Sequence, residues 1–184
     1  MIEAMSVGVE HEVLLSLARR AVETFVLKHK VFEPERDKPS SLLSQRSACF
    51  VSIKTEGREL RGCVGTIEPE HDSLAEEIVD NAIKAATRDP RFRPVSANEL
   101  SLLRYSVDVL GALEPATLED LDPSVFGVVV TNDSDTRRGL LLPNIDGIRT
   151  ADQQVGVAAR KAGIGAHETV RLFRFRTRRF QESA

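Results

Sequence analysis

Apolar residues recur at helical spacing in two segments of the chain. In residues 10–29 and 74–87 they fall at steps of three and four, which gives each segment one apolar side. These apolar positions are Leu14, Leu17, Ala18, Ala21, Val22 and Phe25, and then Leu74, Ala75, Ile78, Val79, Ala82, Ile83 and Ala86. Ser73 and Glu76 have the spacing of a capping box, and Pro90 disfavours helix at the residue before it. Both segments are predicted to be amphipathic helices packed on a core.

Two runs rich in β-branched and apolar residues follow the first helix. Residues 48–55 and 58–67 are joined at Glu56-Gly57, which suits a two-residue type I′ hairpin. That turn would pair Lys54 with Glu59, an opposite-charge cross-strand pair. It would also gather the apolar side chains on one face of the sheet.

The same register separates the two cysteines of the chain. Cys49 would lie on the apolar face of the hairpin, and Cys63 on the opposite face together with Arg61. We therefore expect no disulfide between Cys49 and Cys63.

The rest of the chain mixes short strands with one more helix. Strands are predicted at 102–110, 125–131, 138–142 and 170–180, a helix at 151–162 after a second capping box, and a long loop at 31–47. Gly163 is placed to end that helix. This order predicts an α+β fold, with a mainly antiparallel sheet flanked by helices.

Composition narrows the class of protein. The chain has 184 residues, 41% hydrophobic and 29% charged, as is typical of a globular protein. It has no signal-peptide pattern and no 18-residue apolar run, so we expect a cytoplasmic protein without a membrane span. A net charge of −3 argues against a protein that binds nucleic acid through a broadly basic surface. Of the 25 cationic residues 19 are arginine, which fits either an anion-binding surface or arginine-rich codon usage.

The segment 60–66, LRGCVGT, is the most unusual in the chain. Gly62 and Gly65 stand inside a strand, where glycine needs a reason such as a bulge or the close approach of a backbone or ligand. Arg61 could lower the pKa of the Cys63 thiol and hold an anion, which would make Cys63 a candidate nucleophile. The alternative is that Cys63 is a small buried hydrophobe.

Further arginines stand in two other places. The loop 88–94 carries Arg91 two residues after Asp89, and the predicted last strand carries arginines 174, 176 and 178 on one face. The loop arginines could line a binding site or simply stabilise a helix C-terminus. The strand arginines could bind an anionic partner, or they could protect a sheet edge from aggregation. No residues have metal-ligand spacing, and no cofactor motif is present.

Taken together, these segments resemble the AMMECR domain family, which includes the AmmeMemoRadiSam system protein A. The resemblance runs in order over about residues 12–180 and rests on 50–53, 60–66, 88–92, 118–123, 138–143, 154–164 and 172–175. It implies a larger lobe of residues 1–112 with 170–184, a smaller lobe of 113–169, and a cleft between them near the LRGCVG motif. It also implies a Memo-like protein and a radical S-adenosylmethionine protein as partners.

Three functions remain open from the sequence. The first is a component of a modification pathway that binds an anionic small molecule, with Cys63 as nucleophile and ligand contacts at Arg61, Gly62, Gly65, Asp89 and Arg91. The second is a non-catalytic adaptor for the two partner proteins. The third is an RNA-binding protein that uses its arginine faces. Any metal of such a pathway would belong to the partners.

Overall fold

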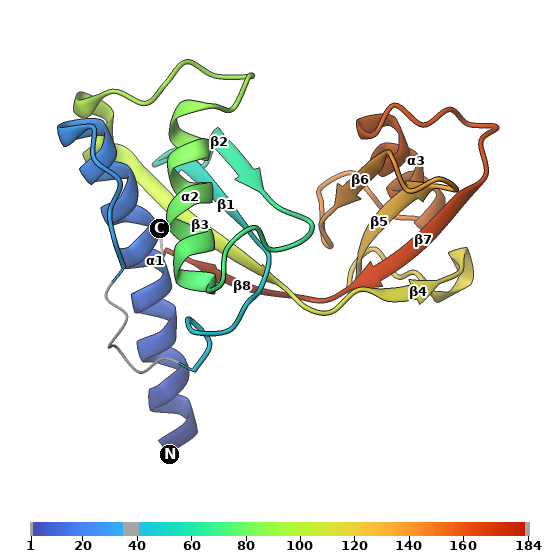
Figure 1. The fold of residues 1–184 in the computed structure, drawn as a ribbon, viewed down its shortest axis with the longest axis horizontal. Coiled ribbons are helices and arrows are strands. Elements are labelled where there is room, and N and C mark those ends of the chain that lie inside the picture. The colour runs from blue at the N-terminus through green and yellow to red at the C-terminus, as the bar shows by residue number, and fades with distance from the viewer. Residues whose placement is uncertain (1, 35–40, 183–184) are drawn as a thin grey trace. The chain divides into compact units, whose positions relative to one another are not determined.

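The computed structural model describes residues 2–34 and 41–182, with side chains from residue 10 onward. Within those residues the chain forms three α-helices, two short 3-10 helices and two four-stranded antiparallel sheets, so the predicted α+β fold is confirmed (Figure 1). Two compact units contain them, Met1–Val109 with Arg179–Ala184 and Leu110–Arg178. Part of the predicted loop, residues 35–40, lies outside the described residues.

The first unit packs two helices on one face of a sheet. Its elements are α1 (Ile2–Lys28), β1 (Cys49–Thr55), β2 (Leu60–Gly65), α2 (Leu74–Thr87), the 3-10 helix η1 (Ala97–Leu102), β3 (Leu103–Leu110) and β8 (Thr177–Gln181). The strand order is β2-β1-β3-β8. Apolar residues of α1, α2 and the alternate positions of β1 and β3 form one core. Both predicted helices are confirmed, although α1 begins earlier than the apolar pattern suggested.

The second unit repeats this packing with one helix. Its elements are β4 (Glu114–Ala116), the 3-10 helix η2 (Leu118–Asp120), β5 (Gly127–Asn132), β6 (Arg138–Leu141), α3 (Ala151–Lys161) and β7 (Val170–Phe175). The strand order is β4-β7-β5-β6. The capping box of Thr150 and Gln153 opens α3, and Gly163 follows it with a φ of 66°. Both features agree with the sequence prediction.

The predicted hairpin exists, but its predicted register is wrong, by one residue at Lys54 and by two residues from Ile53 to Phe50. Phe50 pairs with Gly65 and Ser52 with Cys63, and the register shifts after Ile53. The turn contains one residue more than expected, with Arg58 at a φ of 65°. A three-residue loop of this kind ends in a left-handed residue and a bulge. Because a shift of two keeps side chains on the same face, Cys49 and Cys63 still lie on opposite faces, and both are free.

The predicted single strand over 170–180 is also wrong. The chain breaks at Arg176 into two strands that belong to different sheets. β7 pairs with β4 and β5, and β8 joins β3. Period-two alternation continues across the break, so the sequence pattern alone does not reveal that the strand changes sheets.

Candidate functional site

The face of the first sheet that points away from α1 and α2 carries the polar residues of the LRGCVG region. Cys63 pairs with Ser52 across β2 and β1, and Ser52 pairs with Ser106 across β1 and β3. Asp108 lies two residues farther along β3 on the same side. We call the surface formed by Cys63, Ser52, Ser106 and Asp108 the Cys63 face.

Asp89 fixes the loop after α2 against the outer edge of β2, at Cys63. Its Oδ2 accepts a hydrogen bond from the Cys63 backbone N–H at 2.8 Å. The Arg91 side chain donates to both carboxylate oxygens, from Nε at 2.9 Å and from Nη2 at 2.7 Å. The Asp89 side chain is only 2% exposed, whereas that of Arg91 is 54% exposed. The hydrogen bonds from Arg91 lower the pKa of Asp89 to about 2, so this carboxylate is ionised at neutral pH.

A second pair of the same kind comes from neighbouring strands. Arg179 of β8 donates to Asp108 of β3, from Nε at 2.7 Å and from Nη2 at 3.3 Å. The Asp108 side chain is 2% exposed and that of Arg179 is 40% exposed. In both pairs a buried carboxylate holds an exposed guanidinium in a fixed orientation. Among the described residues, neither Nη1 atom has a hydrogen-bond partner, so these groups can each donate to a ligand.

The thiol itself is held in its neutral form. The Ser52 hydroxyl donates to the Cys63 Sγ at 3.1 Å. Burial raises the pKa of the Cys63 thiol and outweighs the opposing effects of Ser52 and the Arg91 charge. The sequence predicted a thiol pKa lowered by a cationic neighbour. The structure differs, because Cys63 is half-buried and Arg61 is bound elsewhere.

Arg61 points its charge at η1. Its guanidinium pairs with Glu99, with Nε 2.8 Å from Oε1, and also donates to the backbone oxygens of Arg93 and Pro94. The same pairing lowers the pKa of Glu99 to about 2. The Arg61 guanidinium therefore already binds a carboxylate of the protein, Glu99, in the place where the sequence analysis expected an anionic ligand. The sequence analysis did not identify Glu99 as this partner. The spacing of Ser96 and Glu99, a capping box, was the available signal.

The two motif glycines have packing reasons. A Cβ on Gly62 would lie 2.2 Å from the Ala85 backbone oxygen, so only glycine lets β2 approach α2 this closely. A Cβ on Gly65 would lie 2.3 Å from the Phe50 ring. Of the residues singled out from the sequence, the structure thus brings Cys63, Asp89 and Arg91 together. Asp108 and Arg179 form a second pair on the same sheet, and the buried position of Asp108 within β3 was not predicted from the sequence.

Two arginines of the closing segment, Arg174 and Arg176, are engaged within the second unit. The guanidiniums of Arg174 and Arg176 lie over the Phe126 ring, with centroid distances of 4.5 and 4.6 Å. Arg174 also pairs with Glu114. This stacking gives the arginine pattern a structural role.

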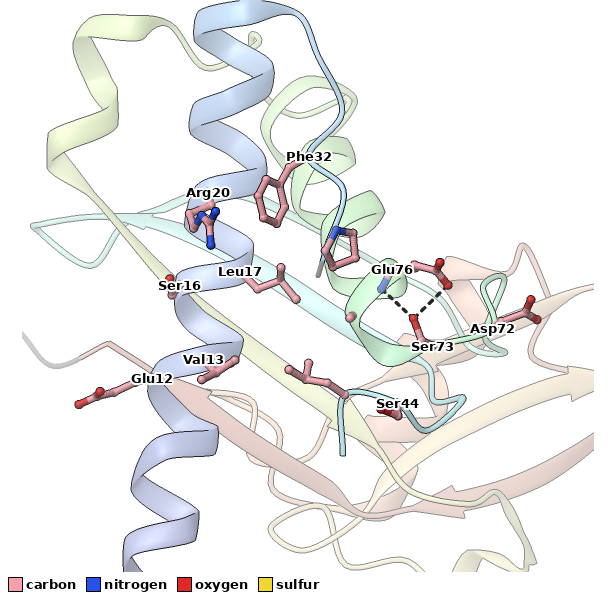
Figure 2. A pocket seen from close by; sticks show the side chains of 13 residues that line it. Glu12, Val13, Ser16, Leu17, Arg20, Phe32, Ser44, Asp72, Ser73 and Glu76 are labelled. Atoms are coloured by element: carbon pink, nitrogen blue, oxygen red, sulfur yellow. Dashed lines mark hydrogen bonds between the residues drawn. The ribbon is translucent and has the colours of Figure 1, made fainter. Parts of the chain in front are cut away.

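A cavity of about 540 Å³ lies elsewhere in the first unit, between α1 and the start of α2 (Figure 2). Apolar side chains of Val13, Leu17 and Phe32 line it, and the Arg20 guanidinium lies 4.4 Å from the Phe32 ring centroid. Figure 2 shows the hydrogen bonds between Ser73 and Glu76 at the start of α2, which confirm Ser73 as the N-cap.

One cluster has the composition of a metal site. Glu70, His71 and Asp80 place three potential ligand atoms within 4.8 Å of one another. The Lys84 ammonium already binds this cluster, 3.0 Å from Glu70 Oε2 and 2.7 Å from Asp80 Oδ2. A cation of the chain itself therefore already binds both carboxylates, and we assign no metal to them. Among the described helices, none combines the length and hydropathy needed to cross a bilayer.

The chain is similar to proteins of bacteria and archaea. A Thermotoga maritima protein is 44% identical over 167 residues, which cover 89% of this chain and 94% of that protein. A Clostridium acetobutylicum protein is 40% identical over 95% of this chain, although the match covers 37% of that longer protein. The crystal structure of the uncharacterized protein PH0010 from Pyrococcus horikoshii is 28% identical. It superposes with a TM-score of 0.83 over 94% of this chain and 91% of that one. The AMMECR1 family profile matches residues 15–181, and the chain therefore belongs to the AMMECR1 family.

Proposed function

We propose that this protein binds a small anionic molecule on the Cys63 face. The observation that carries the proposal is the arrangement of Asp89, which holds both the Cys63 backbone and the exposed Arg91 guanidinium. Charged hydrogen bonds from a guanidinium are strong and suit carboxylate and phosphate oxygens. A second oriented guanidinium, that of Arg179, lies on β8 at the other edge of the same sheet, where it is held by Asp108.

In this proposal Cys63 contacts the ligand as a neutral thiol. Its pKa is raised by burial, so the thiolate needed for nucleophilic attack is scarce at neutral pH. Nucleophilic catalysis by Cys63 would require the ligand or a partner to remove the thiol proton. We therefore favour binding of a ligand or pathway intermediate over a preactivated cysteine enzyme. A Memo-like protein and a radical S-adenosylmethionine protein are the proposed partners that would supply or consume this ligand.

Titration with inorganic phosphate tests the anion site directly. Amide and arginine Nε resonances of the wild type should shift saturably at Cys63 and Arg91. Arg91→Gln should weaken phosphate binding about tenfold, as expected for the loss of a charged hydrogen bond. Arg93→Gln is the matched control, because this exposed side chain lies in the same loop and makes none of the contacts to Asp89 or Cys63. Equal phosphate affinity of the wild type and Arg91→Gln would contradict the proposal.

A further inference from the structure

The Cys63 face continues into a hollow beside the β1–β2 turn. This turn hollow has a volume of about 360 Å³ and is lined by Lys54, Thr55, Glu56, Arg58, Arg104, Tyr105, Ser106, Gln181 and Glu182. Its volume is within the range of small-molecule sites. Ser106 connects it to the thiol, since Ser106 pairs with Ser52, whose hydroxyl donates to Cys63.

The charge of the turn hollow favours an anion. Both of its carboxylates are already bound, because Glu56 pairs with Arg104 at 2.7 Å and Glu182 pairs with Arg19 at 2.8 Å. In the described part of the chain, the side chains of Lys54 and Arg58 have no carboxylate partner. Two positive charges, those of Lys54 and Arg58, therefore line this hollow without a carboxylate to balance them.

The backbone at Arg58 gives a second, independent observation. Arg58 adopts a φ of 65°, the left-handed region at the end of a three-residue turn. Glycine is the usual residue in that position of the turn, because a side chain is strained there. Such strain is found at functional sites as well as in turns, and His29, Asp135 and Asn144 also have a positive φ. The chain accepts the strain and thereby places a guanidinium at the mouth of the turn hollow.

We propose that the turn hollow is a second anion-binding subsite, formed by Lys54, Arg58 and Arg104. This inference rests on the proposed function and names the substrate class, a small molecule with two separate anionic groups. One group would lie on the Cys63 face, and the other in the turn hollow. Along β1 the two ends are four residues apart, from Phe50 opposite Asp108 to Lys54 opposite Arg104. Four residues of strand span about 13 Å.

Two matched probes test the second subsite. Hexanediol bisphosphate carries a phosphate at each end of its chain, and hexyl phosphate carries one. The wild type should bind the bisphosphate at least about tenfold more tightly, because the second contact becomes intramolecular. The double variant Lys54→Gln, Arg58→Gly should lose this preference and keep the affinity for hexyl phosphate. Arg58→Lys should retain the preference, since it restores a cation in the same place.

The outcomes separate the two proposals. Equal binding of both probes by the wild type would overturn the second subsite and leave the anion site beside Cys63 standing. Loss of the preference in Arg58→Lys as well would show that a positive charge at this position does not produce the preference, which also overturns the inference. Failure of the wild type to bind either phosphate would overturn the proposed function together with it.

Discussion

The variant Asp89→Asn removes the negative charge of this buried carboxylate and keeps nearly the same side-chain shape. The pKa of Asp89 is lowered from its ordinary 3.8 to about 2, first by the hydrogen bonds of Arg91. One pKa unit corresponds to about 1.4 kcal/mol. The ionised carboxylate therefore contributes about 2 kcal/mol to the free energy of unfolding at neutral pH. The side chain is almost fully buried, so solvent screens little of this effect.

The sign of the pH dependence follows from the direction of the pKa shift. A carboxyl group whose pKa is lower in the folded protein stabilises the fold above its ordinary pKa. This contribution is lost as the pH falls from 3.8 through about 2. Asp89→Asn should therefore reduce the free energy of unfolding by about 2 kcal/mol at pH 7. The gap between variant and wild type should shrink steadily below a pH of about 4.

Urea unfolding at a series of pH values measures this gap. Asp133→Asn is the control, an exposed aspartate of the second unit, and should change the free energy of unfolding by less than about 0.5 kcal/mol. A gap for Asp89→Asn that stays constant between neutral and acid pH would refute the reasoning. It would show that the amide disturbs packing or hydrogen-bond geometry, and that the charge of Asp89 contributes nothing.

Three further variants or reactions test other parts of the structure. Arg58→Gly should raise the free energy of unfolding by roughly 1 kcal/mol, measured by urea unfolding, because glycine relieves the left-handed backbone. Gly62→Ala should lower it by about 1–3 kcal/mol, since its Cβ would meet the backbone of α2, whereas Gly57→Ala, whose nearest neighbour lies 3.6 Å away, should be tolerated. Alkylation of Cys63, followed by mass spectrometry, should be slow at neutral pH and accelerate only in the alkaline range, because burial raises its pKa. Cys49, with a pKa of about 12, should react only after unfolding, and fast labelling of either cysteine in the folded protein would contradict these assignments.

The helices and strands could be predicted from local sequence patterns, whereas the pairing of the strands could not. Capping residues and apolar periodicity located α2 and α3 almost to the residue, because helices are specified by neighbours in sequence. The hairpin register depended on one residue in the turn, where Arg58 takes the left-handed position that the prediction gave to glycine. The change of sheets at Arg176 depends on contacts with strands that are distant in sequence. Period-two alternation contains no information about those contacts.

The candidate site could likewise be predicted only in part: its residues stand out in the sequence, but their contacts do not. Cys63, Asp89 and Arg91 stand out in sequence because cysteine, glycine, proline and arginine cluster in two short motifs. Their roles required the fold, since only the packed loop brings the Asp89 carboxylate to the Cys63 backbone. Arg179 could not be found beforehand, because its partner Asp108 lies 71 residues earlier in the chain.

The position of β8 has a consequence for how this protein is made. β8 is the fourth strand of the first sheet and supplies Arg179, yet it follows β3 only after residues 111–176. A ribosome therefore synthesises nearly all of the second unit before it produces the strand that completes the first sheet. At typical translation rates of about 5–20 residues per second, the nascent first unit waits for several seconds with β3 as an open edge. An unpaired edge strand invites pairing with other chains, so a chaperone that shields this edge during synthesis would favour correct folding.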